Sequence, residues 1–421
     1  MNRLLAALLA ATSPLSAAQA QSARTAETPP GLTLEQALDL AGATAPSLDA
    51  AGAGVDAARA AQAAAGLRPN PILTVEAENV AGTGLYADTK SLEATASLAL
   101  PLELGGKRSA RLAIAAAQRD RAMIEQAVAR VDLRFAVTRA YAEAAASERR
   151  LANARDQLRI AGEGLHAAHV RLRAGRASPM EVQRAELARI NAQAALVRME
   201  RSAETARFIL AQRIGQAIPG ALDAGWFDRI GTAHGPLKPL EPTETLALAA
   251  ADADLAASSA QVRLARTQRI PDLTVGAGVR RLEATNDSAA LFSLSLPLPF
   301  LNGGKAAVGQ ALAEQRRAEA QRRAIAQEVA QAIAQAQAEA ANAAIGAETA
   351  TGPALAAAEE AARIARIGYR EGKFSQLDLL DAERTLTETK AAAIEALLAY
   401  HNARAQLERL TARAPDQGDD R

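Results

Sequence analysis

The chain contains no cysteine, and this absence excludes several classes of site. A disulfide framework, a thiolate metal centre, a cysteine nucleophile and a lipid-modified N-terminal cysteine all need that side chain. Aromatic residues make up only 3% of the sequence, which suits closely packed, alanine-rich helices better than a large globular core. Lys and Arg (48) nearly balance Asp and Glu (47), so the composition gives no reason to expect nucleic acid as a partner.

Long apolar runs are also missing, because no segment after the N-terminus offers the roughly 20 apolar residues that a transmembrane helix needs. Residues 1–20 have the pattern of a secretory signal peptide. Arg3 supplies the positive charge, Leu4–Ala11 the short apolar run and Ala18–Ala20 the cleavage site. We therefore expect the chain to leave the cytoplasm and to begin, after cleavage, at Gln21. Any membrane insertion must then use strands.

Motifs of catalysis are missing as well. The sequence has neither H-E-x-x-H nor G-x-S-x-G. Two Gly-Gly-Lys segments, at 105–107 and 303–305, lack the other residues of a phosphate-binding loop and fit turns from a strand into a helix. His166 and His169 lie on one helix face, but two ligands do not complete a metal site. We expect no enzyme, no cofactor and no metal site.

What the chain does contain is an internal repeat. Three pairs of segments match in the same order and at nearly the same offset, which indicates a duplicated unit. The matching pairs are 171–187 with 368–384, 71–80 with 271–280, and 101–107 with 297–305.

Each repeat predicts a helix, a β-hairpin and a long helical hairpin. The first helix is expected over 33–67, where Thr33 and Gln36 form a capping box. The predicted organisation is a signal peptide (1–20), a first unit (21–215) with a β-hairpin at 72–100 and a helical tip near 175, a linker (216–241), a second unit (242–412) with a β-hairpin at 272–298 and a tip near 372, and a disordered tail (413–421).

Apolar residues alternate with small or polar ones in both predicted β-hairpins. Leu73 and Val75, for example, alternate with Thr74 and Glu76. One apolar and one polar face suit a barrel wall between lipid and water, although a soluble sandwich shows the same alternation. The charged residues on the polar side, which either line a lumen or only keep the wall hydrated, are Glu76, Glu78, Glu93 and Arg280.

The helical hairpins carry a sustained heptad pattern, which predicts coiled-coil packing. A helix of about 65 residues reaches on the order of 100 Å. The two long helices are expected to end at Gly175 and Gly372, each followed by a serine N-cap with an acidic residue three positions later. These pairs are Ser178 with Glu181 and Ser375 with Asp378.

Together these features resemble the outer membrane factor family, the TolC-like channels of Gram-negative bacteria, over essentially the whole mature chain. The resemblance rests on the duplication, on Glu103–Lys107 (ELGGK), on Tyr369 and on the pattern Gly-x-x-Ser-x-x-Asp-x-x-Asp at Gly372–Asp381. ELGGKR is most similar to the heavy-metal branch, the outer membrane components of cobalt–zinc–cadmium-type efflux systems.

The resemblance implies a mostly α fold with membrane β structure. It implies a homotrimer in outer membrane lipid, in which each protomer gives four strands to a twelve-stranded barrel and its coiled-coil helices form a long periplasmic extension. A periplasmic adaptor (a membrane fusion protein) and an inner membrane resistance-nodulation-division pump are the implied partners. The channel would conduct passively, because the pump supplies the energy.

The resemblance also implies roles for the tips. Asp378 and Asp381 match aspartates that ring the closed periplasmic aperture, and Glu181 has a similar place in the first repeat. Asp378 could instead only cap its helix. Arg184 stands where the second repeat has Asp381, so the two tips need not act alike. The residues expected to face the adaptor are Gly175, Ser178, Gly372 and Ser375.

Two other functions stay open at this point. A drug-efflux or type I protein-secretion duct would share the fold, and fold does not settle the substrate. A soluble periplasmic coiled-coil scaffold or adaptor belongs to another class and predicts no strands facing lipid.

Overall fold

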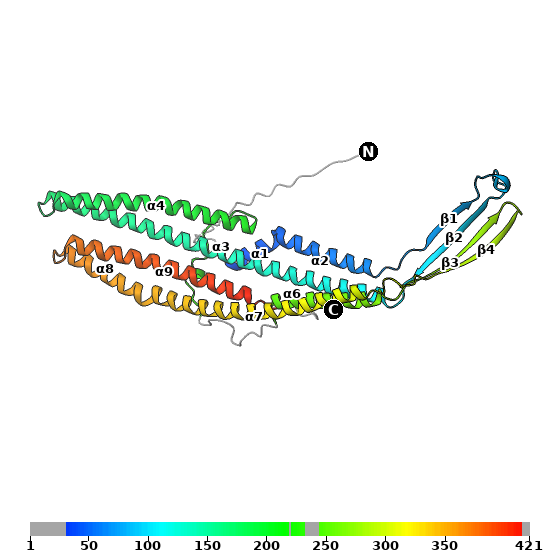
Figure 1. Cartoon of the computed structure of the whole chain (residues 1–421). Helices are drawn as coiled ribbons and strands as arrows, with labels where there is room; N and C mark the ends of the chain where they lie inside the picture. The colour runs from blue at the N-terminus through cyan, green and yellow to red at the C-terminus, as the bar shows by residue number, and fades with distance from the viewer. Residues whose placement is uncertain (1–30, 219, 232–243, 415–421) are drawn as a thin grey trace, which may run out of the picture.

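The computed structural model describes residues 31–218, 220–231 and 244–414. The predicted signal peptide, most of the tail and part of the linker lie outside these ranges. The molecule is elongated, with the strands at one end and the turns of two helical hairpins at the other (Figure 1). The described residues are mostly helical, as expected, and none of their helices is both long and apolar enough to cross a membrane.

Four strands form one antiparallel sheet in the order β1-β2-β3-β4. They are β1 (Ile72–Glu78), β2 (Glu93–Leu102), β3 (Leu273–Leu282) and β4 (Asp287–Ser295). A β-hairpin lies at each place where the alternation predicts one, and pairing of β2 with β3 joins the two hairpins. Since β1 and β4 are each paired on one side only, the sheet has two edges with unpaired backbone groups.

The two faces of this sheet differ in polarity. Direct partners such as Val75, Ala96 and Val279 share a face, and alternate residues along each strand follow them there. Phe292 of β4 lies on the same face and is 87% exposed. The other exposed apolar side chains of this face are Leu73, Leu98, Leu100, Leu102 and Leu294. A contiguous apolar surface of this kind marks contact with lipid or with another molecule.

The first half of the chain supplies α1 (Leu34–Thr44), α2 (Pro46–Ala65), α3 (Lys107–Arg173) and α4 (Pro179–Ile214). The capping box at the start of α1 is confirmed, because Thr33 Oγ1 accepts from the Gln36 N–H at 3.2 Å and Gln36 Oε1 accepts from the Thr33 N–H. The prediction of one helix over 33–67 is wrong. Ala45 is extended (φ −75°, ψ 113°), because the proline ring of Pro46 disfavours helical geometry at the residue before it.

The second half supplies α6 (Leu246–Thr267), α7 (Lys305–Thr349), α8 (Leu355–Arg370) and α9 (Gln376–Leu410). A π-helical turn over Ala350–Ala354 connects α7 to α8 and contains Pro353. Proline has no N–H to donate, and a widened turn accommodates it without ending the helix. The long helix therefore continues to the tip although Gly352 and Pro353 interrupt its sequence.

Small side chains let the helices pack closely. Ala168 on α3 is fully buried beside Ala185 on α4, and Ala362 on α8 is fully buried beside Leu386 on α9. Alanine loses no side-chain entropy on burial and allows a short distance between helix axes. The high alanine content thus appears in the structure as the contact surface of the two helical hairpins.

The largest core lies near the middle of the molecule, where the segment after α4 returns to the helices. Tyr141 on α3 is completely buried there. Its hydroxyl donates to Leu32 O at 2.7 Å and accepts from the Asp223 N–H at 3.1 Å. Burial raises the pKa of Tyr141 to about 12, so the phenol stays protonated and able to donate.

A short helix, α5 (Ala224–Phe227), attaches the same segment to α9. The Trp226 ring stacks on His401 with centroids 4.1 Å apart, and His401 Nε2 donates to Phe227 O at 2.9 Å. Burial, which outweighs this hydrogen bond, lowers the pKa of His401 from its ordinary value of 6.5. The buried imidazole is therefore neutral near pH 7.

This burial predicts that the protein loses stability in mild acid. The unfolded chain binds a proton at His401 more readily than the folded chain does, so the stability contributed by the neutral imidazole is lost as pH falls through 6.5. We expect the thermal midpoint to drop between about pH 7.5 and about pH 5.5, and to drop less in His401→Gln. Differential scanning calorimetry at the two pH values checks this. Equal pH dependence in both proteins would contradict it.

Candidate functional site

Two glycine turns form the tips of the helical hairpins. Gly175, between α3 and α4, has φ 68°, and Gly372, between α8 and α9, has φ 76°. Apart from the two adjoining residues in the chain, nothing lies within 4 Å of where a Cβ would stand on either glycine. The glycines are therefore required by backbone conformation rather than by space. Ser178 and Ser375 cap the helices that follow, as the sequence predicts.

Asp378 takes part in the cap of α9. Its Oδ2 accepts from the Ser375 N–H at 2.9 Å and from the Ser375 hydroxyl at 2.7 Å, while the Asp378 N–H donates to Ser375 Oγ at 3.2 Å. The bond from the Ser375 hydroxyl, followed by the one from its N–H, lowers the pKa of Asp378. The capping role that was one of two alternatives for this residue is thus present in the structure.

Asp381 lies one turn further along α9 and is free of the cap. Its exposed carboxylate pairs only with Arg384, at 2.8 Å on the same helix, among the contacts described. In the first hairpin, Glu181 occupies the position of Asp378, and its Oε2 is buried without a hydrogen-bond partner in the described part of the chain. The tips therefore differ in charge pairing, as Arg184 at the Asp381 position predicts.

A contact between the two tips was not predicted. The Arg171 guanidinium of α3 lies 4.6 Å from the centre of the Tyr369 ring of α8, a distance suited to a cation–π interaction. Near it, the Phe374 ring packs on Gly368, where a Cβ would stand 2.2 Å from Phe374 Cδ2. In the first repeat, Arg171 stands at the position of Gly368. This difference between the repeats was the sequence signal that could have pointed to the contact between the tips.

The polar face of the sheet brings together three of the four charged residues predicted for it. Arg280 on β3 pairs with Glu93 on β2 at 2.8 Å and with Glu78 on β1 at 3.4 Å. Its Nε also donates to Thr95 Oγ1 at 3.0 Å. Glu76 lies on the same face, two residues before Glu78. One arginine thus links three strands and partly neutralises the acidic face.

The Gly-Gly-Lys segments lie where strands pass into helices. Gly105, Gly106 and Gly304 all have positive φ, between 72° and 81°. Lys107 Nζ pairs with Asp272 at 2.7 Å, and Asp272 also accepts from the Leu104 N–H at 3.0 Å. These bonds tie the end of β2 to the start of β3. The turns are structural, which agrees with their missing phosphate-loop residues.

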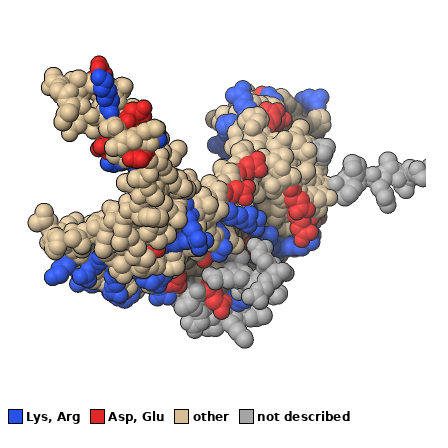
Figure 2. Space-filling view, turned by 90° about the vertical axis from the view of Figure 1, so that its right-hand side faces the viewer, with Lys and Arg blue, Asp and Glu red and all other residues tan. Residues whose placement is uncertain are grey.

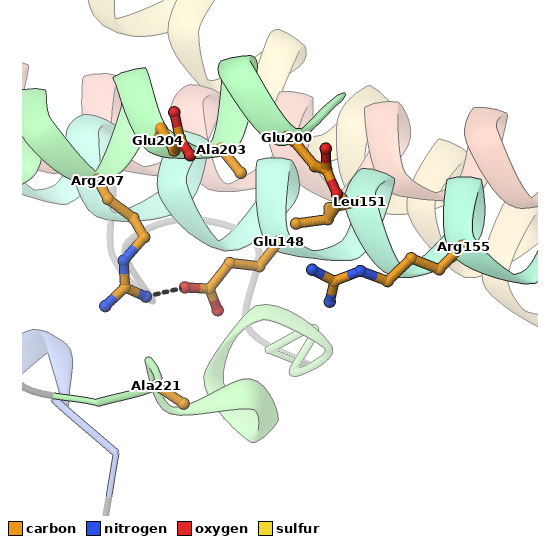
Figure 3. Close-up of a pocket in the computed structure, with 8 residues that line it drawn as sticks. All are labelled: Glu148, Leu151, Arg155, Glu200, Ala203, Glu204, Arg207 and Ala221. Carbon is orange, nitrogen blue, oxygen red and sulfur yellow. Dashed lines mark hydrogen bonds and ion pairs between the residues drawn. The ribbon is translucent and has the colours of Figure 1, made fainter. Parts of the chain in front are cut away.

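A cavity of about 480 Å³ lies between α3, α4 and the segment at Ala221 (Figure 3). Glu148 and Arg207 point toward each other across it and form an ion pair, and Arg207 Nη2 donates to Gly220 O at 2.5 Å. Arg207 thereby fastens the segment after α4 to the hairpin. The residues that line the cavity are Glu148, Leu151, Arg155, Glu200, Ala203, Glu204, Arg207 and Ala221.

No metal centre is found in the ranges that the structure covers, since no three His, Asp or Glu side chains are placed to hold an ion. His166 and His169 are exposed on α3.

The family model described as outer membrane efflux protein matches residues 37–216 and 243–413. The cobalt-zinc-cadmium resistance protein CzcC of Cupriavidus metallidurans is 30% identical over 91% of this chain and 90% of its own. The nickel-cobalt-cadmium resistance protein NccC of Alcaligenes xylosoxydans xylosoxydans is 30% identical over 72% of this chain and 69% of its own.

A solved structure with the same fold is the outer membrane protein VceC of Vibrio cholerae. It is 20% identical and superposes with a TM-score of 0.73 over 90% of this chain and 96% of its own.

Proposed function

Because the chain belongs to the outer membrane efflux protein family, we propose that it is the outer membrane duct of a tripartite efflux system for divalent heavy-metal cations. Its location is the outer membrane, with the long helices extending into the periplasm. The observation that carries the metal assignment is the 30% identity to CzcC across nine-tenths of both chains. The exposed apolar face of the sheet supports insertion into lipid.

Three copies of the chain would build the barrel. Four strands cannot close a barrel alone, and unpaired strand edges do not survive in hydrocarbon. Pairing β4 of one copy with β1 of the next removes both edges, and closed cyclic symmetry is the commonest solution. Twelve strands then enclose a lumen, and the internal duplication gives each copy two β-hairpins and two helical hairpins. Glu76, Glu78, Glu93 and Arg280 would line that lumen.

The tips of the helical hairpins would contact the partner proteins of the efflux system. A periplasmic adaptor would dock around Gly175, Ser178, Gly372 and Ser375, and a resistance-nodulation-division pump would supply the energy. Asp378, Asp381 and Glu181 would ring the periplasmic aperture. Threefold repetition of these carboxylates would concentrate negative charge at a constriction, which favours cations over anions. The exposure of the Asp381 carboxylate supports this role.

Removing the Asp381 carboxylate is predicted to reduce cation selectivity. Asp381→Ala takes three negative charges from the aperture, so we expect the cation-to-anion permeability ratio to fall about threefold. Asp381→Glu, which keeps the charge, should behave as the parent protein does. Stability should not change, because an exposed pair contributes little. Reversal potentials in planar bilayers under a salt gradient measure the ratio, and an unchanged ratio in Asp381→Ala would remove Asp381 from the aperture.

Growth of a deletion strain tests the cargo. The strain is challenged with zinc, cadmium, cobalt, nickel and copper, and with a panel of drugs. We expect sensitivity to a subset of the metals and its reversal by the intact gene. Sensitivity to drugs alone would retain the duct and reject the metal cargo.

A further inference from the structure

The junction between the sheet and the helices carries more positive than negative charge. Its two carboxylates are both engaged by cations, Asp272 by Lys107 and Glu103 by Arg111. The further cations at this level are Arg68, Arg108, Arg269 and Lys305. All four are exposed, and within the described ranges none forms an ion pair with a carboxylate. We refer to these four residues as the junction collar.

Two collar arginines are fixed by the turns that surround them. Arg108 Nε donates to Gly66 O at 2.5 Å, at the end of α2, and Arg269 Nε donates to Gly303 O at 3.0 Å, before α7. A Cβ on Gly304 would stand 2.8 Å from Arg269 Cγ, so the glycine leaves room for the arginine stem. Each arginine therefore uses its Nε on the backbone, and its terminal nitrogens remain for an outside acceptor. Because both arginine side chains are already held in place, less side-chain entropy is lost when they bind a ligand.

Exposed apolar side chains lie beside these cations. Leu298, Phe300 and Leu301 are 62%, 85% and 103% exposed and precede Lys305 in the turn from β4 to α7. Leu67 and Leu104 are exposed next to Arg68 and near Arg108. The apolar surface of the sheet thus continues to the collar and ends there. Apolar side chains followed by cations match the order of acyl chains and phosphates at a membrane surface.

Figure 2 views the molecule from the sheet end. Lys and Arg gather on the lower side of the helical body and again at its upper right, whereas Asp and Glu form smaller separate groups. An excess of exposed cations favours contact with an anionic surface.

We propose that the junction collar binds the phosphate groups of anionic glycerophospholipids in the leaflet where the sheet passes into the helices. The inference rests on the proposed insertion of the sheet into the outer membrane. Anionic lipids should be preferred over zwitterionic ones, because a zwitterionic head group carries its own cation beside the phosphate. Each collar cation near an anionic surface is expected to strengthen binding about fivefold.

Native mass spectrometry of the detergent-extracted protein tests the collar. The probes are phosphatidylglycerol and phosphatidylethanolamine with identical acyl chains. We expect the parent protein to retain phosphatidylglycerol at least about tenfold more tightly, and Arg269→Gln with Lys305→Gln to lose most of that preference. The matched control is Arg198→Gln with Arg201→Gln, which removes two exposed cations from the middle of α4 and should change nothing.

Other outcomes overturn the inference in distinguishable ways. Equal retention of both lipids by a protein that fractionates with the outer membrane would reject the collar and leave the proposed function intact. Displacement of phosphatidylglycerol by an equal concentration of glycerol phosphate would indicate a site for free phosphate instead. A collar variant with a reduced oligomeric mass would indicate contact with a second copy. Absence of the parent protein from the outer membrane would overturn the collar and the proposed function together.

Discussion

Leu98→Arg is expected to abolish assembly in the outer membrane. Leu98 lies near the middle of β2 on the apolar face, between Leu73 and Ala277, and is 52% exposed. An arginine facing lipid near the bilayer midplane costs about 2–4 kcal/mol, and a trimer carries the cost three times. The variant should be depleted at least about tenfold from the outer membrane fraction in quantitative immunoblots.

Ser97→Arg is the matched control. Ser97 precedes Leu98 in the same strand, but its partners Thr74 and Gly278 place it on the polar face. An arginine there faces water in the proposed lumen, so the variant should reach the outer membrane in near-normal amount. If both variants were lost equally, the apolar face would not be the lipid face, and the assignment of lumen residues would be reversed or wrong.

Tyr141→Ala is expected to have the second largest effect. The side chain is fully buried in the central core, and its ring meets the edge of Trp226 with centroids 5.0 Å apart. Truncating a buried aromatic residue to alanine leaves a cavity and costs about 3–5 kcal/mol. We expect a lower thermal midpoint and more rapid proteolysis between α4 and α6, because the segment held by the Tyr141 hydroxyl is released.

Tyr141→Phe separates packing from hydrogen bonding. It keeps the ring and removes only the hydroxyl. The Asp223 N–H still donates to Leu32 O at 3.0 Å, so neither group is left wholly without a partner. The cost should therefore be only about 1 kcal/mol. A loss as large as that of Tyr141→Ala would show that the hydroxyl, rather than ring packing, holds the segment.

Local features of the fold could be predicted from the sequence because their signals lie within a few residues. The Thr33–Gln36 box and the Ser375–Asp378 cap each depend on two side chains three positions apart. The strands follow from a period of two, and the tip glycines from the end of a helical pattern. The break at Pro46 was also local, but the alanine-rich pattern continues on both sides of it and concealed the boundary.

Contacts between distant segments could not be predicted in the same way. The Tyr141 hydroxyl meets Leu32 O across 109 positions, and His401 meets Phe227 O across 174. Nothing in the local sequence specifies these partners, since they depend on how the segment after α4 wraps around the helices. The charge difference between the tips was visible in the sequence as Arg184 against Asp381, but the partners of each carboxylate were not. The spacing from Ser375 marks Asp378 as a possible cap residue, which the structure confirms, whereas the pairing of Asp381 with Arg384 became visible only in the structure.

The central claim is that three copies of this chain form one closed barrel in the outer membrane. The most direct test is the native mass of the protein extracted from that membrane. We predict that detergent is required for extraction and that the protein mass corresponds to three processed chains. A single chain that remains in solution without detergent would contradict the account, because an isolated sheet would then keep both edges and its whole apolar face in water.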